Sequence, residues 1–500
     1  MSARAIVVGA GFGGLAAAIG LAARGVSVRV VEAGAGPGGK ADVVVLDGVE
    51  VDTGPSVLTL PEVFDAVFRL AGSSLKDEVT LVTPPPGSPS FRYHFADGAR
   101  VDIFLAAEDT IASVGRSLGS EAAADLTRFL QDARTIWEAA APHFVMGPSP
   151  SIWNLLSFDA IVALLHIDPL RTMESAIARR VRSPHLRQVL WRYATYNGSD
   201  PRRAPATLNC IAHVELALGG FGVRGGVHAL VRALVSAAQR LGVEFQWDSP
   251  VTRIAVQSGR ARGVEVHGRL LPADIVVANA DASHVSRDLL AEGQLPLRAS
   301  QPSLSGWTGV LRAQNLPGRA SHTVVFPEDY QAEFVDMFYR NRAPQDPAVY
   351  LCAQDLAHER PGWPDAQPVF VMANAPAGCA DVAELQSAAL KRGRAAGLLQ
   401  PEDRLLWSRT PLELAERFPG SQGSLYGAAS NGPWAAFARP PNRSSGVRGL
   451  YLASGSAHPG GGMPLCARSG LAAAECATDD MRADLSLPVA LPVPRLKDQQ

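Results

Sequence analysis

The stretch Ala5-Ile-Val-Val-Gly-Ala-Gly-Phe-Gly-Gly-Leu-Ala-Ala-Ala-Ile19 decides the fold of this 500-residue chain. Its apolar start is typical of a buried strand and its end of a helix, with a glycine turn between them. Gly9, Gly11 and Gly14 form the G-x-G-x-x-G pattern, in which the first glycine makes the turn, the second admits a pyrophosphate to the backbone and the third lets helix and strand pack closely. The helix N-terminus then favours the negative charge of the phosphates.

The residues that follow this turn strengthen the prediction of a dinucleotide site. Residues 26–31 are typical of a second strand, which ends in Glu32. Glu32 lies 18 residues after Gly14, near the spacing of about 20 expected of the acid that binds a ribose hydroxyl. Because the chain has 47 glycines, a chance glycine turn in an unrelated α/β protein is the alternative.

Composition limits the classes of protein that remain. A chain of 500 residues predicts about two or three domains. The 46 basic and 48 acidic residues nearly balance, so we expect no nucleic-acid partner. Five cysteines without a C-x-x-C pair argue against a disulfide framework or a zinc site. We also expect no metal, no secretory signal and no transmembrane helix, and therefore a cytoplasmic protein.

The chain contains three more glycine-rich stretches. Residues 33–40 form a flexible turn that ends in Lys40, for which contact with a diphosphate and an exposed loop position are both open. Residues 52–56 follow a predicted hairpin that turns at Asp47-Gly48. Residues 449–464 repeat the order of strand, glycine turn and helix start, so that a second helix N-terminus can point at the same ligand.

One apolar segment has two possible interpretations. Residues 144–170 contain many large apolar side chains and few charges, but they include no stretch of about 18 uninterrupted apolar residues and are short for a membrane span. They form either a buried helical element of a second domain or an apolar helix that leans on a bilayer surface and admits a lipid-like substrate.

The chain resembles the bacterial carotenoid (phytoene-type) desaturases, which are flavoproteins related to the amine oxidases. The matching pieces run in the expected order at residues 7–15, 32 with 38–40, 52–55, 200–205, 225–226 and 456–464. Residues 426–432 and 438–443 are most similar to those of desaturases of acyclic hydroxylated or methoxylated carotenoids, which introduce a C-3,4 double bond.

The resemblance implies an α/β fold, with a Rossmann-like FAD-binding domain of the amine-oxidase type and an interleaved α+β substrate domain. The FAD-binding domain is expected at 1–80, 221–290 and 441–484, the substrate domain at 81–220 and 291–440, and a tail at 485–500. A separate second domain that interrupts the first explains why the cofactor motifs are so far apart in the chain.

The resemblance also assigns residues to FAD. The pyrophosphate is expected at Gly9, Gly11 and Gly14, and the adenosine ribose at Glu32. The remaining assignments are Gly39, Lys40, Thr53, Gly54, Pro55 and Ser56 near the diphosphate and ribityl chain, Val251 at the adenine, and Gly455, Gly461, Gly462 and Met463 beside the flavin ring. Many related flavoproteins carry an acid where Ser456 stands here.

The implied activity is desaturation of a hydrophobic carotenoid, with quinone or oxygen as the electron acceptor. If the reaction uses a base, Asp159 in the apolar segment is the candidate, and a helix-capping role for it is the alternative. Peripheral association with the inner membrane is expected because the substrate dissolves there. A phytoene-type desaturase, a carotenoid isomerase or saturase, an amine oxidase and a non-enzymatic prenyl-binding escort protein are the alternatives.

Overall fold

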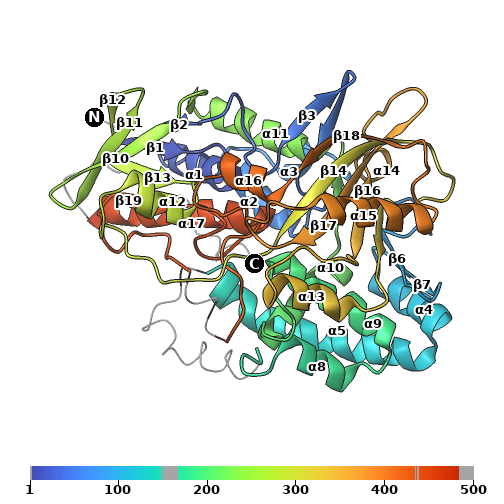
Figure 1. Ribbon diagram of the computed structural model, residues 1–500. Helices are drawn as coiled ribbons and strands as arrows, with labels where there is room; N and C mark the ends of the chain where they lie inside the picture. The colour runs from blue at the N-terminus through green and yellow to red at the C-terminus, as the bar shows by residue number, and fades with distance from the viewer. Residues whose placement is uncertain (1–2, 148, 150–166, 434, 436–438, 484–500) are drawn as a thin grey trace.

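The computed structural model describes residues 3–147, 149, 167–433, 435 and 439–483. Figure 1 shows a parallel sheet with its helices on one side of the molecule and a larger sheet with a group of helices on the other. Segments far apart in the sequence build each half, as the predicted interleaving requires. The predicted domain boundaries themselves stay a prediction.

The first half is built on a five-stranded sheet in which all neighbouring strands are parallel. Its order is β19 (Leu450–Leu452), β13 (Ile275–Ala278), β1 (Arg4–Val8), β2 (Ser27–Val31) and β9 (Glu244–Gln246). The central strands are apolar and buried, as expected when both faces of a parallel sheet are covered. The predicted Rossmann-like architecture is therefore present.

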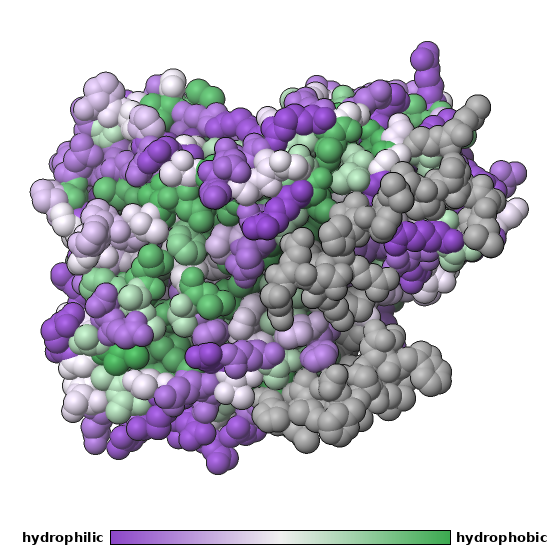
Figure 2. All heavy atoms as spheres, turned by 180° about the vertical axis from the view of Figure 1, so that it is seen from behind, coloured by the Kyte–Doolittle hydropathy of each residue, from purple (hydrophilic) through white to green (hydrophobic). Residues whose placement is uncertain are grey.

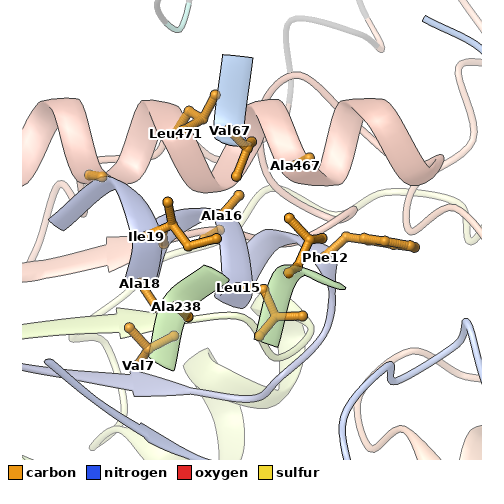
Figure 3. Close-up of a cluster of buried hydrophobic side chains, with 14 of the residues drawn as sticks. Val7, Phe12, Leu15, Ala16, Ala18, Ile19, Val67, Ala238, Ala467 and Leu471 are labelled. Carbon is orange, nitrogen blue, oxygen red and sulfur yellow. The ribbon is translucent and has the colours of Figure 1, made fainter. Parts of the chain in front are cut away.

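Four helices cover one face of this sheet: α1 (Phe12–Ala22), α2 (Pro61–Leu70), α11 (Val227–Arg240) and α17 (Met463–Ala483). Figure 3 shows Phe12 and Ile19 of α1 in one apolar core with Leu471 of α17 and Val67 of α2. A side chain at Gly470 of α17 would collide with a backbone carbonyl of α1. The helices α1 and α17 therefore pack backbone against backbone.

The strands between β9 and β13 do not enter the parallel sheet. The structure places β10 (Val251–Gln257), β11 (Arg260–Val266) and β12 (Arg269–Pro272) in a separate three-stranded antiparallel sheet. The strands on either side of them in the chain, β9 and β13, do join the parallel sheet. Short hairpin links allow antiparallel pairing without a crossover helix, which the pattern of separate strands did not reveal.

The second half is built on a seven-stranded mixed sheet. Its order is β18 (Arg404–Arg409), β14 (Ser305–Ala313), β17 (Gln367–Ala375), β16 (Val349–Ala353), β15 (His322–Val325), β6 (Phe91–His94) and β7 (Arg100–Ile103). The helices drawn beside it in Figure 1 are α4 (Ala107–Leu118), α5 (Ser120–Ala140), α8 (Met173–Arg180), α9 (Pro184–Arg192), α10 (Cys210–Leu216) and α13 (Tyr330–Phe338).

The remaining elements of the described residues lie between or beside the two sheets. The predicted hairpin is present as β3 (Val43–Leu46) and β4 (Val49–Asp52), and both turn residues have positive φ, as a tight two-residue turn requires. The others are α3 (Leu75–Glu78), β5 (Leu81–Val82), η1 (Ala141–Val145), η2 (Tyr193–Asn197), η3 (Ala206–Asn209), β8 (Gly222–Val223), α12 (Ala282–His284), η4 (Val285–Leu289), α14 (Gln354–His358), α15 (Ala383–Ala395) and α16 (Pro411–Arg417). Among the helices of the described residues, none has the length and apolar character needed to cross a membrane.

Candidate functional site

The first glycine turn connects β1 to α1. Gly9 has φ +99°, a conformation that side chains disfavour, so the turn requires glycine there. A Cβ atom on Gly14 would collide with the carbonyl oxygen of Gly9, and this close approach brings the start of α1 against the strand. The backbone thus has the shape that the predicted pyrophosphate turn needs.

Asn279 joins this turn to two neighbouring strands. It follows β13 directly, its Oδ1 accepts a hydrogen bond from the Gly11 N–H at 3.2 Å, and its Nδ2 donates to the carbonyl oxygen of Ala453 after β19. The carboxyl ends of parallel strands meet at one edge of the sheet, which is where such folds bind ligands. Sequence reasoning missed Asn279, although a polar residue directly after a buried strand was a usable signal.

Glu32 lies at the carboxyl end of β2, next to the same turn. Its Oε2 accepts a hydrogen bond from the Ala10 N–H at 2.7 Å and its Oε1 from the Gly34 N–H at 2.8 Å. A carboxylate has about four acceptor positions, so two ribose hydroxyls can still donate to it. The Ser249 N–H donates to the Glu32 carbonyl at 2.8 Å, which places the start of β10, with Val251, beside this acid.

Lys40 and Gly54 bring two of the predicted loops together. A side chain on Gly54 would collide with the Lys40 carbonyl. The Lys40 Nζ donates to the carbonyl oxygens of Ser424 at 2.7 Å and Leu425 at 3.3 Å, and burial lowers the pKa of this ammonium. Lys40 therefore ties the first cofactor loop to the 424–425 segment, and its contact with the diphosphate stays a prediction.

Asp52 fixes the start of the 52–56 loop through a buried ion pair. Its Oδ1 lies 3.0 Å from Nη2 of Arg360, and both side chains are only 3% exposed. Its Oδ2 accepts a hydrogen bond from the Val227 N–H, the first residue of α11, at 2.7 Å. A Cβ atom on Gly226 would collide with the Arg360 guanidinium. The glycine pair at 225–226 thus leaves the space in which this ion pair forms.

The second glycine turn precedes α17. A Cβ on Gly461 would lie 2.6 Å from the Cα of Tyr426, and one on Gly455 would lie 3.1 Å from the Cα of Gly461. Gly462 has φ +111° and nothing within 4 Å of the position of a Cβ atom. The turn is packed on one side and open on the other, and Met463 begins the helix behind it.

Six polar side chains in the region of the two glycine turns and the large sheet are only half-buried. They are Lys40, Arg192, Tyr196, Tyr350, Tyr426 and Cys466. Part of each side chain is therefore available for contact with a ligand.

The family model for flavin containing amine oxidoreductases matches residues 12–314. The chain belongs to this family. The hydroxyneurosporene desaturase of Rhodobacter capsulatus is 35% identical over 493 residues, which cover 95% of this chain and 97% of that protein. This flavoprotein therefore belongs with the carotenoid desaturases, and the predicted family and the FAD cofactor are confirmed.

Other relatives of this flavoprotein differ in their named reactions. The 4,4'-diapolycopene oxygenase of a Methylomonas species is 32% identical and the 1-hydroxycarotenoid 3,4-desaturase of a Flavobacterium species 29% identical, with 96% and 93% of this chain covered and 98% and 96% of theirs. The solved cyclohexylamine oxidase of Brevibacterium oxydans superposes with a TM-score of 0.61 at 16% identity, over 96% of this chain and 100% of that one. That likeness confirms the predicted fold class.

Two features of this flavoprotein fit FAD at the predicted position. The Thr53 hydroxyl is buried and has no hydrogen-bond partner among the described residues, so it is free for a polar ligand atom. The open side of Gly462 leaves room for a planar ring against the backbone. Ser456, where related flavoproteins carry an acid, instead accepts a hydrogen bond from the Ala282 N–H at 2.8 Å.

A second group that sequence reasoning missed supports the last cofactor segment. The Asn442 Nδ2 donates to the carbonyls of Leu452 at 3.0 Å and His458 at 2.8 Å. Arg439 donates to the Gly455 carbonyl at 3.1 Å, and burial lowers the pKa of this guanidinium to about 10. Both residues thus hold the strand and turn before α17 in place.

The proposed base Asp159 and most of the apolar segment 144–170 lie outside the described residues. Their roles stay predictions. The other predicted site residues, from Gly9 to Met463, lie in turns or at the first residues of helices and strands, at the carboxyl edge of the parallel sheet or beside it. Ser56 lies against Tyr350 of the large sheet.

Proposed function

We propose that this protein is an FAD-dependent desaturase that introduces a C-3,4 double bond into an acyclic carotenoid with a hydroxyl or methoxy group at its end. The observation that carries the proposal is the likeness to a hydroxyneurosporene desaturase along 95% of the chain. The motifs at 426–432 and 438–443, similar to those of 3,4-desaturases, support the position of the double bond.

We propose that the substrate lies in a hollow between the cofactor turns and the large sheet, beside the six half-buried polar side chains. FAD supplies a hydride acceptor for a C–H bond of the substrate, and a proton leaves the adjacent carbon. The conjugated polyene itself stabilises the positive charge that develops, so the protein needs mainly to orient the chain and to exclude water. A hollow enclosed between the cofactor turns and the sheet meets both needs, and Asp159 is the proposed acceptor for the proton if a side chain accepts it.

Arg192 disfavours the amine-oxidase alternative. Its guanidinium lies 5.0 Å from the ring centre of Tyr196 and 5.5 Å from that of Tyr350. Aromatic faces attract cations, but here a cation of the protein already occupies them. A protonated amine that entered the hollow would meet a fixed positive charge, whereas an uncharged carotenoid would not.

We also propose peripheral contact with the inner membrane and reoxidation by quinone or oxygen. The support for membrane contact is chemical, because the substrate dissolves in lipid. Figure 2 adds that hydrophobic residues reach the surface across the face seen from behind, beside the residues drawn in grey. Flotation with liposomes tests this contact, and protein that stays entirely in the soluble fraction would contradict it.

Product analysis tests the proposed reaction. The FAD-loaded protein is incubated with hydroxyneurosporene in lipid vesicles. The products are then separated, and their masses are measured by mass spectrometry. A product lighter by two hydrogens, with a red-shifted absorption, is expected. A product of unchanged mass would instead indicate an isomerase, two added hydrogens a saturase, and an added oxygen a reaction like that of the oxygenase relative.

A further inference from the structure

Arg192, the last residue of α9, lies within a group of tyrosines from several elements. Its guanidinium faces the rings of Tyr196, Tyr350 and Tyr93, with ring centres at 5.0, 5.5 and 6.0 Å. Its Nη1 donates a hydrogen bond to the Tyr196 hydroxyl at 2.6 Å. These contacts hold the guanidinium in one position.

The large sheet supplies two of these tyrosines from one face. Tyr93 of β6 and Tyr350 of β16 both pair with Val324 of β15, which lies between them. Side chains in register on adjacent strands point to the same face of a sheet. The two phenol rings therefore approach Arg192 from the same side.

Glu215 of α10 balances the charge of Arg192. The Tyr193 hydroxyl donates to its Oε1 at 2.9 Å, and burial raises the pKa of this carboxyl. One basic and one acidic group thus lie together in the interior. An ionic ligand would add an unbalanced charge there, whereas an uncharged hydroxyl or ether oxygen would not.

The Tyr330 hydroxyl lacks a hydrogen-bond partner among the described residues, and Tyr330 is only 2% exposed. Tyr93 and Glu215 instead contact Arg192, Tyr193 and Tyr196 within this region. Nearly all buried polar atoms in proteins have a partner. The unpaired Tyr330 hydroxyl therefore indicates a place where a polar ligand atom binds.

This region adjoins the cofactor turn. The Cα of Tyr426 would lie 2.6 Å from a Cβ on Gly461, and the Tyr426 N–H donates to the Ser303 Oγ at 2.9 Å. The next residue, Leu304, donates its N–H at 3.0 Å to the carbonyl of Gly198, two residues after Tyr196. An oxygen on C-1 of an acyclic carotenoid is separated from C-3 by two carbons only, C-1 and C-2. A site that binds this oxygen must therefore adjoin the reacting bond, as this region does.

We propose that these residues, the tyrosine–arginine cluster, bind the hydroxyl or ether oxygen on the end carbon of the substrate: Tyr93, Arg192, Tyr196, Glu215, Tyr330 and Tyr350. This inference rests on the proposed desaturase function. The cluster selects oxygenated ends and fixes which bond of the chain lies at the flavin. The Tyr330 hydroxyl is left unpaired when the substrate end lacks oxygen.

The test compares hydroxyneurosporene with neurosporene, which has the same chain without the hydroxyl. The wild-type protein should desaturate hydroxyneurosporene with a kcat/KM at least tenfold higher, because a site built for a hydroxyl rejects the analogue that lacks it. Tyr330→Phe should lower kcat/KM for hydroxyneurosporene about tenfold and leave the value for neurosporene within about twofold. Tyr93→Phe should behave alike.

Tyr339→Phe is the matched control, since Tyr339 comes directly after α13, the helix that begins at Tyr330, but is 59% exposed. Tyr339→Phe should change kcat/KM for neither substrate. Equal effects of Tyr330→Phe on both substrates, or no effect on either, would overturn the proposal. If a variant loses FAD or stability, the ratio of the wild-type kcat/KM values for hydroxyneurosporene and neurosporene is the test. Similar values for the two substrates would overturn the proposal too. Desaturation of neither carotenoid would instead contradict the desaturase function itself.

Discussion

The Asp52–Arg360 pair offers a direct test of how the cofactor loop is held. In Asp52→Asn the shape of the side chain is kept but the charge is lost. In the wild-type protein, the Asp52 Oδ2 accepts a hydrogen bond from the Val227 N–H at 2.7 Å, and Oδ1 accepts one from Arg360 at 3.0 Å. Either orientation of the new amide points its NH2 group at one of these two donors.

The expected loss of stability follows from burial. Both side chains of the pair are 3% exposed, and removal of one partner of a buried ion pair costs about 3–5 kcal/mol. The amide oxygen keeps one of the two hydrogen bonds, so we expect a loss of about 3 kcal/mol. Because Asp52 begins the loop that contains Thr53, the variant should also release FAD more readily.

The assay measures the urea midpoint of unfolding and the flavin that stays bound after gel filtration. Glu244→Gln is the matched control, because it makes the same chemical change in an ion pair with Arg29 at 2.6 Å whose side chains are 43% and 66% exposed. Exposed pairs contribute about 0–1 kcal/mol. If Asp52→Asn lies within about 1 kcal/mol of this control and keeps its FAD, the pair does not hold the loop.

Three further predictions follow from single sites. Gly461→Ala should release most of the bound flavin, because the new methyl group would lie 2.6 Å from the Cα of Tyr426; bound flavin absorbance measures this, and full retention would contradict it. Burial lowers the pKa values of His358 and His458 to about 4, whereas both histidines bind a proton below about pH 6.5 in the unfolded chain. The free energy of unfolding should therefore fall as the pH is lowered from 6.5 to 4, by up to about 1.4 kcal/mol per pH unit for each histidine. Urea midpoints that stay constant over this range would disprove it. Glu32→Gln should weaken FAD binding, as measured by flavin fluorescence titration, and an unchanged affinity would remove the ribose assignment.

Local patterns in the chain predicted the cofactor half well. The strand, glycine turn and helix at the N-terminus lie within about twenty consecutive residues, and Glu32 follows at a fixed spacing. The hairpin at Asp47-Gly48 likewise depends on two adjacent residues with positive φ. Such features are set by backbone preferences and by the periodicity of apolar residues, which short stretches of sequence contain.

Contacts between distant segments could not be predicted in this way. The separate sheet of β10–β12 depends on which strands pair, and strands of the same apolar pattern fit either sheet. Asn279 accepts a hydrogen bond from the N–H of Gly11, which lies 268 positions away in the chain. A polar residue after a strand suggests an edge of the sheet but does not identify its partner.

The sequence by itself determined the Rossmann-like start, the FAD cofactor and the likeness to carotenoid desaturases, because each depends on local motifs in a fixed order. Only the tertiary structure decided how those motifs are held and what faces the substrate. Asp52 meets Arg360 across 308 positions of chain, and Arg192 meets Tyr350 from another layer of the fold. A buried charge needs a partner wherever the chain can supply one, and that choice is made by packing in three dimensions.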